Sequence, residues 1–134
     1  MRKKYIELTI KEAKKAAKYG EVPIGCIIVK DGKVISKAYN LVEKKKDATM
    51  HAEIIAIKKA SKHIRNWRLL DCEMYVTLEP CNMCKNAIEL SRIKKVYYLI
   101  KKVKDIDIKN DKYEYISDKN ESLNLIQTFF KKRR

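Results

Sequence analysis

The sequence predicts a single α/β domain, and two observations carry that prediction. The first is the order of elements. A helix and a two-strand hairpin come first, and strands then alternate with helices, which is typical of a sheet covered by helices. The second is size, because 134 residues, 46% of them hydrophobic, are enough for one packed core. No repeat or linker divides the chain, so we expect residues 1–134 to form one domain.

The pattern of apolar residues indicates nine elements. Apolar residues three and four apart indicate helices, and short apolar or alternating runs indicate strands. The expected elements are a helix over 5–19, strands over 25–30 and 33–39, a helix over 49–61, a strand over 73–78, a helix over 80–91, strands over 95–100 and 112–116, and a helix over 121–131.

Residues at the boundaries support this division. Gly20 is suited to end the first helix. Asp31-Gly32 is a favoured two-residue turn between antiparallel strands. Residues 41–47 read as a charged loop, and the helix that follows would hold His51 in its first turn. Pro80 is suited to the first position of the next helix.

The charge of the chain favours a polyanionic partner. Lys and Arg number 32 against 17 Asp and Glu, a net charge of +15, which favours nucleic acid. A lysine-rich proteome would give the same excess without any such partner. No apolar run is long enough to cross a bilayer, and no apolar segment of a signal peptide follows the charged start. We therefore expect a cytoplasmic protein with no membrane partner.

Two short stretches carry the chemistry. His51-Ala52-Glu53 offers an imidazole and a carboxylate, and Pro80-Cys81-Asn82-Met83-Cys84 offers two thiols. One His and two Cys are a ligand set for catalytic zinc, which keeps its fourth position for water. Both cysteines lie near an expected helix N-terminus, where the helix dipole lowers thiol pKa values and favours thiolate.

The spare carboxylate indicates catalysis. Zn²⁺ lowers the pKa of a bound water toward about 7, and Glu53 in the first turn could move protons between that water and a substrate. The spacing H-x-E followed by P-C-x-x-C is the signature of zinc-dependent deaminases.

Two other meanings of the cysteine pair stay open. A structural zinc would need a fourth ligand, for which Cys26, Cys72 or His63 could serve, and a redox pair is possible in principle. Otherwise Cys26 and Cys72 lie inside apolar runs, and we expect them to be buried as small hydrophobic residues.

The chain resembles the bacterial tRNA-specific adenosine deaminases of the cytidine deaminase superfamily over nearly its whole length. The runs that carry the resemblance are EVPIG at 21–25, Asn40, TMHAEI at 49–54, NWRL at 66–69, LEPCNMC at 78–84, SRI at 91–93 and the final Phe129-Phe130 with its basic tail. The resemblance implies a three-layer α/β/α fold on a five-strand mixed sheet, and a homodimer. It also implies hydrolysis of adenosine to inosine at the wobble position of a tRNA anticodon stem-loop.

The resemblance also implies roles for individual residues. By position these are His51, Cys81 and Cys84 as zinc ligands, Glu53 as proton shuttle, Asn40 at the purine edge, and the Ala52 N–H as the group that steadies the oxygen arriving on the ring. The C-terminal helix would lie against RNA. Phe130 could stack on a base, and Lys131, Arg133 and Arg134 could contact phosphates. A Phe pair on a terminal helix is equally a candidate for core.

The segment after Tyr98 departs from the family. The relatives carry an Arg-Asp pair and a longer small-residue loop there, whereas this chain has Lys102 where the Asp would be. A shorter loop leaves room for the alternative that the protein deaminates free nucleobases or nucleosides of the guanine, cytosine or adenine type. A substrate of that kind would not explain the basic tail.

Overall fold

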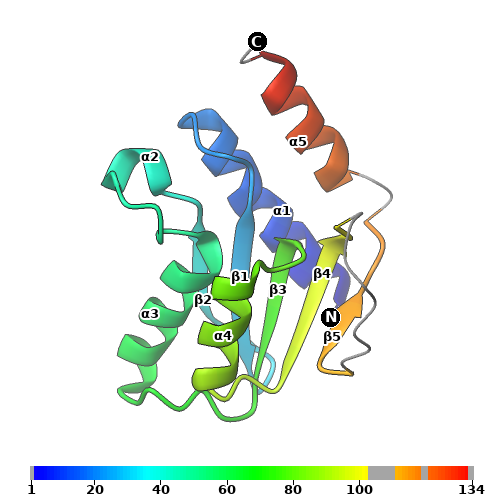
Figure 1. Ribbon diagram of the computed structural model, residues 1–134. Coiled ribbons are helices and arrows are strands. Elements are labelled where there is room, and N and C mark those ends of the chain that lie inside the picture. Colours follow the sequence, from blue (N-terminus) through cyan, green and yellow to red (C-terminus); the bar gives the residue numbers. More distant parts are fainter. Residues whose placement is uncertain (1, 103–110, 119–120, 133–134) are drawn as a thin grey trace.

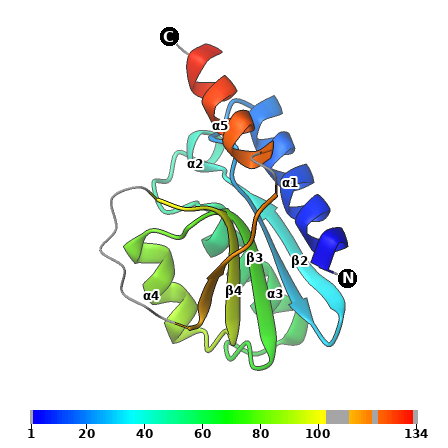
Figure 2. The same ribbon diagram turned by 90° about the vertical axis from the view of Figure 1, so that its right-hand side faces the viewer.

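The apolar strands assemble into one mixed sheet with helices on both faces, as Figures 1 and 2 show. The computed structural model describes residues 2–102, 111–118 and 121–132. Its elements are α1 (Arg2–Lys18), β1 (Gly25–Lys30), β2 (Lys33–Tyr39), α2 (Val42–Lys45), α3 (Ala52–Ile64), β3 (Cys72–Leu78), α4 (Asn82–Leu90), β4 (Lys95–Ile100), β5 (Tyr113–Tyr115) and α5 (Glu121–Lys132). The predicted three-layer α/β/α fold with five strands is confirmed.

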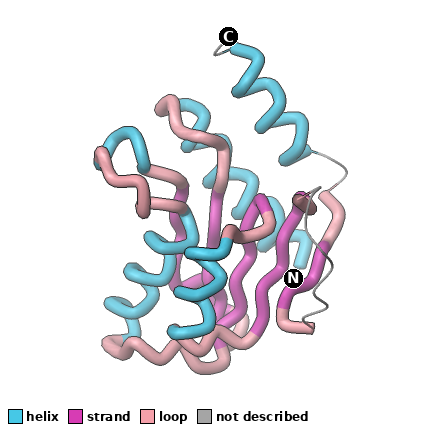
Figure 3. The backbone as a smooth tube through the Cα atoms, viewed as in Figure 1, coloured by secondary structure: helices cyan, strands magenta, loops and turns pink. Residues whose placement is uncertain are grey.

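Strand directions bring the functional loops to one edge of the sheet. The strand order is β2-β1-β3-β4-β5, where β1 is antiparallel to both β2 and β3, and β3, β4 and β5 are parallel. All strands except β1 therefore point the same way, and their carboxyl ends lie at one edge of the sheet. Figure 3 shows the strands side by side between the helices. Open α/β sheets bind ligands at that edge.

Alternation along the strands divides the core between the two faces. In β1, Cys26 and Ile28 pack with α3 and α4, whereas Ile27 and Val29 pack on the α1 side. Cys26 is fully buried, and so is Cys72, the first residue of β3, which confirms the prediction made for both thiols. Within the described residues, no helix is both long and apolar enough to span a bilayer.

The structure corrects the prediction for one loop. The predicted loop over 41–47 contains α2, a single helical turn. Its first N–H groups, those of Glu43 and Lys44, donate to the two carboxylate oxygens of Glu21 at 3.0 and 2.9 Å. Glu21 is 1% exposed and lies before β1, so the contact joins residues 22 and 23 positions apart. The local pattern could not reveal a cap that comes from so far along the chain.

Replacement of Gly25 by alanine should destabilise the fold, because α1 crosses β1 in close contact there. An added Cβ would clash with the Thr9 carbonyl oxygen and would lie 2.5 Å from the Ala13 nitrogen. Backbone atoms cannot give way as a side-chain tip can, so we expect a loss of about 3 kcal/mol in the free energy of unfolding. Urea denaturation measures this, and a change below about 0.5 kcal/mol would contradict the close approach.

Candidate active site

Two helix N-termini meet at the carboxyl edge of the sheet. His51 is the N-cap of α3 and Cys81 is the N-cap of α4, and both have extended backbones. The sequence placed His51 inside the first turn and Pro80 at the helix start. Both expectations were wrong by one or two residues. The correction has a chemical consequence, because neither N-cap side chain bonds to its own helix, so both are available for a shared ligand.

The geometry of the three side chains fits zinc. His51 Nδ1 lies 3.7 Å from Cys81 Sγ and 3.6 Å from Cys84 Sγ, and the three ligand atoms all lie within 4.8 Å of one another. A tetrahedral zinc holds its nitrogen and sulfur ligands about 3.6 Å apart, since its Zn–N and Zn–S bonds are about 2.0 and 2.3 Å. Within the described residues, the cluster does not include Cys26, Cys72 or His63, so it resembles a three-ligand catalytic site.

The expected thiolate character of Cys84 needs a correction. Its side chain is fully buried, and burial, followed by the charges of Glu53 and Cys81, raises the pKa of this thiol well above its ordinary value. The helix N-terminus therefore does not by itself make Cys84 a thiolate. A cation must supply the compensating charge, so metal binding would release a proton from this residue.

Glu53 lies beside the ligand cluster. It is the acidic residue in the first turn of α3 and is 4% exposed. Burial raises the pKa of its carboxyl group to about 7, against the opposing effects of a backbone hydrogen bond, the Cys84 thiol and the charge of Lys102. A group with that pKa can both accept and donate a proton near neutral pH. Its predicted role as proton shuttle stays a prediction.

Asn40 and Ala52 contact each other directly. The Ala52 N–H donates to Asn40 Oδ1 at 2.9 Å, between the end of β2 and the start of α3. Asn40 is 7% exposed, so its amide is held inside the site with one orientation. The predicted contact of the Ala52 N–H with an arriving oxygen stays a prediction, and here that N–H orients Asn40.

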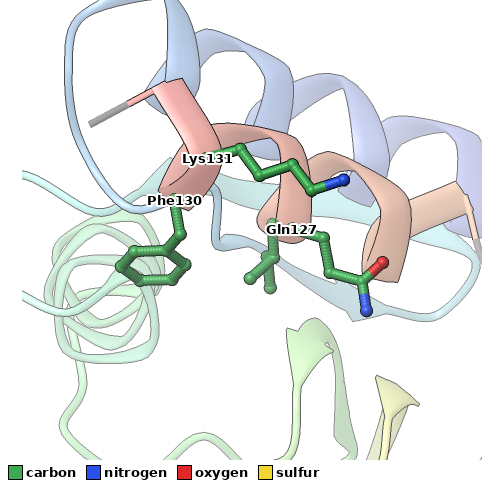
Figure 4. A pocket seen from close by; sticks show the side chains of 4 residues that line it. Gln127, Phe130 and Lys131 are labelled. Atoms are coloured by element: carbon green, nitrogen blue, oxygen red, sulfur yellow. The ribbon is translucent and has the colours of Figure 1, made fainter. Parts of the chain in front are cut away.

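The C-terminal helix lies at the same end of the molecule as the N-termini of α3 and α4 (Figure 1). It packs beside α1, where Lys14 and Glu121 form an ion pair of 3.2 Å. Ile126, Gln127, Phe130 and Lys131 line an open hollow of about 430 Å³, and Figure 4 shows Phe130 and Gln127 pointing into it. Phe130 is 51% exposed and is therefore not a core residue.

The predicted RNA contacts of Phe130 and Lys131 stay predictions. Those of Arg133 and Arg134 fall outside the described residues.

The sequence did not single out Glu79 for the site. Its Oε1 accepts the N–H of Lys102 at 3.3 Å, and its Oε2 lies 3.5 Å from Lys85 Nζ. Glu79 therefore joins the loop that carries Cys81 to the end of β4. The signal was present in the LEPCNMC run, but only the pairing of β3 with β4 shows what Glu79 binds.

Comparisons with known proteins agree on the superfamily. Residues 1–100 match the family model described as the cytidine and deoxycytidylate deaminase zinc-binding region. The chain is 53% identical over 94 residues to a tRNA-specific adenosine deaminase of Aquifex aeolicus, an alignment that spans 70% of this chain and 62% of that protein. It is 56% identical over 82 residues to the chloroplastic tRNA(adenine(34)) deaminase of Arabidopsis thaliana, which spans 61% of this chain and 6% of that protein.

The similar solved structures are of two kinds of deaminase. One, from a study of A-to-I editing by tRNA:A34 deaminases at the wobble position, has a TM-score of 0.74 and 42% identity, and covers 75% of this chain and 78% of that one. A guanine deaminase from Bacillus subtilis has a TM-score of 0.72 and 36% identity, with 75% and 65% covered. The chain spans about 60% of the length of the bacterial curated relatives it matches, between 55% and 62% for those compared.

Proposed function

The chain belongs to the family of cytidine and deoxycytidylate deaminases with a zinc-binding region, and on that premise we propose that it hydrolyses adenosine to inosine at the wobble position of tRNA anticodons. The observation that carries the proposal is the convergence of His51, Cys81 and Cys84 beside the buried carboxyl group of Glu53. The tRNA substrate is supported by the names of the similar proteins and by the net charge of +15.

In the proposed mechanism His51, Cys81 and Cys84 would hold Zn²⁺. When bound, zinc would act as a Lewis acid and lower the pKa of a water molecule toward about 7. Glu53 would accept one proton from the attacking water and pass it to the purine ring nitrogen. It would then move the second proton, from the hydroxyl added to the ring carbon, to the amine as the carbon–nitrogen bond breaks, so that adenosine and water yield inosine and ammonia. Its pKa of about 7 suits both halves of this transfer.

Asn40 holds the purine edge in this proposal. Its Oδ1 is occupied by the Ala52 N–H at 2.9 Å, which aims Nδ2 as a donor toward an acceptor on the base. Phe130 and Lys131, with Arg133 and Arg134, would contact the RNA on either side of the reacting nucleotide. We further propose one deaminase domain over residues 1–134, a homodimer and a cytoplasmic location.

A deaminase of free nucleobases is the second candidate, and the similarity to the Bacillus subtilis guanine deaminase favours it. The two candidates share the metal centre and the proton shuttle, so the chemistry at zinc does not separate them. They differ in whether the substrate carries phosphates.

A panel of substrates tests the proposed function. We expect the zinc-loaded protein to convert adenosine to inosine in an anticodon stem-loop with adenosine at the wobble position, and to leave cytidine, adenine and guanine unchanged. Chromatography of the digested products measures each conversion. A stem-loop with the adenosine moved to the neighbouring position is the matched control. Deamination of a free base with none in the stem-loop would contradict the proposal.

A further inference from the structure

Lys102 lies close to the loop that carries Cys81 because β3 and β4 end side by side. Leu78 of β3 pairs with Ile100 of β4, and the Glu79 N–H donates to the Ile100 carbonyl oxygen at 3.0 Å. Two residues further, the Lys102 N–H donates to Glu79 Oε1 at 3.3 Å. Because Glu79 precedes Cys81 by two residues, these bonds fix the backbone of Lys102 next to the metal-binding loop.

The neighbouring residues Lys101 and Lys102 have different surroundings. The half-buried Lys102 bears electrostatically on Glu53, whose pKa its charge lowers. Lys101 is exposed, and its ammonium lies 5.8 Å from the ring centre of Tyr115, next to β5. The charge of Lys102 therefore acts on the carboxyl group beside the ligand cluster, whereas the Lys101 ammonium lies against the ring of Tyr115.

Within the described residues, the charge of Lys102 has no ion-pair partner. Glu79 accepts the Lys102 N–H with one carboxylate oxygen, and its other oxygen pairs with the Lys85 ammonium at 3.5 Å. None of the ion pairs formed by described residues includes Lys102. A half-buried cation next to the ligand cluster favours an anion there, and its partial burial limits screening by salt.

We propose that Lys102 binds the phosphodiester group adjoining the reacting nucleotide and so selects an oligonucleotide over a free base. This inference rests on the proposed function and names what distinguishes its substrate. A purine base is neutral, so a cation beside the pocket adds little to its binding. A phosphodiester is an anion joined to the reacting nucleoside, so binding of that nucleoside brings the phosphodiester next to Lys102.

The hollow under α5 is consistent with an RNA strand leaving the site. Phe130 and Lys131 line it at the same end of the molecule, which provides an aromatic face and a second cation.

A purely structural role for Lys102 predicts a different result. If the charge of Lys102 served only to lower the pKa of Glu53, replacing Lys102 would change kcat and its pH profile equally for every substrate. A phosphate contact adds a rise in KM for RNA that depends on the charge of one linkage, beyond any change in kcat that follows from the pKa of Glu53.

The test compares Lys102→Gln, Lys102→Arg and the matched control Lys101→Gln, which removes an equal charge from the neighbouring position. Each protein is assayed on the anticodon stem-loop and on two copies of it, in which a neutral methylphosphonate replaces the linkage on the 5′ or the 3′ side of the target adenosine. The dissociation constants are measured in parallel, with each substitution combined with Glu53→Ala to prevent turnover.

We expect Lys102→Gln to raise KM and the dissociation constant for the natural stem-loop about tenfold and to reduce the salt dependence by about one counterion. Lys102→Arg should restore most of the affinity, and Lys101→Gln should change it by less than about twofold. One of the two methylphosphonates should weaken stem-loop binding to the wild-type protein about tenfold. The same methylphosphonate should hardly change binding to the Lys102→Gln variant, because the neutral linkage and the substitution remove the same contact.

The inference would be overturned if the losses of affinity from Lys102→Gln and from the methylphosphonate added up at both linkages. Equal losses of affinity in Lys101→Gln and Lys102→Gln would also overturn it. A wild-type protein that turns over no stem-loop would refute the proposed function. The dissociation constants would still decide whether Lys102 binds a phosphate.

Discussion

Replacement of Glu53 by alanine should lower kcat by at least about a thousandfold while the protein keeps its fold and its zinc. The reason is that Glu53 supplies no atom to the His51, Cys81 and Cys84 cluster, yet it is the buried carboxyl group next to it. Inosine formation on the stem-loop under single-turnover conditions measures the loss. Zinc content by atomic absorption and the far-UV circular dichroism spectrum verify that the variant is intact.

Glu53→Gln provides the isosteric comparison. It should be as inactive as Glu53→Ala, because an amide cannot exchange protons at neutral pH. Activity above about a tenth of wild type in either variant would contradict the assignment of the proton shuttle to Glu53.

Wild-type protein and Glu53→Gln should also differ, without metal, in how the free energy of unfolding depends on pH. The pKa of Glu53 is raised from 4.5 in the unfolded chain to about 7 in the fold. The folded state therefore binds more protons between these values, and this contribution to stability is present below pH 4.5 and lost as the pH rises through about 7. Metal-free Glu53→Gln should escape that loss, which amounts to roughly 3 kcal/mol.

Replacement of Cys84 by alanine should abolish both stoichiometric zinc binding and deamination. The variant leaves His51 and Cys81 as a two-ligand site, and two ligands do not hold zinc at the free concentrations present in a chelator buffer. Inductively coupled plasma spectrometry after dialysis against EDTA measures the metal, and the stem-loop assay measures turnover. Readdition of zinc should restore wild-type activity and leave the variant inactive.

Cys72→Ala is the matched control, because Cys72 is equally buried but does not belong to the ligand cluster. It should cost about 1 kcal/mol of stability and keep both zinc and activity. Loss of zinc from Cys72→Ala would revive the alternative of a structural site with a fourth cysteine ligand.

Zinc removal should also lower the midpoint of thermal unfolding of the wild-type protein. Zinc binds the folded state, where three ligands from two helix N-termini meet, in preference to the unfolded chain, so its removal withdraws the stabilisation that binding provides. The Cys84→Ala variant should show no such change on addition of EDTA.

Local patterns predicted every described helix and strand except α2. The five strands and the helices α1, α3, α4 and α5 follow from the spacing of their apolar residues, because packing on one face imposes a period of 2 or 3.6. The single turn α2 escaped prediction, since it is only four residues long and depends on the distant carboxylate of Glu21. The start of α4 was predicted two residues early, because Pro80 is suited to a first helical position.

The sequence by itself determined the fold class and predicted the candidate zinc ligands. His51, Cys81 and Cys84 stood out as candidates because zinc chemistry restricts the residue types and their spacing. Only the tertiary structure decided how these groups act. It brought together two helix N-termini that lie 30 residues apart, set the pKa of Glu53 by burial and turned the Ala52 N–H toward Asn40. It also placed the backbone of Lys102 beside the loop that carries Cys81, because the pairing of β3 with β4 fixes where β4 ends.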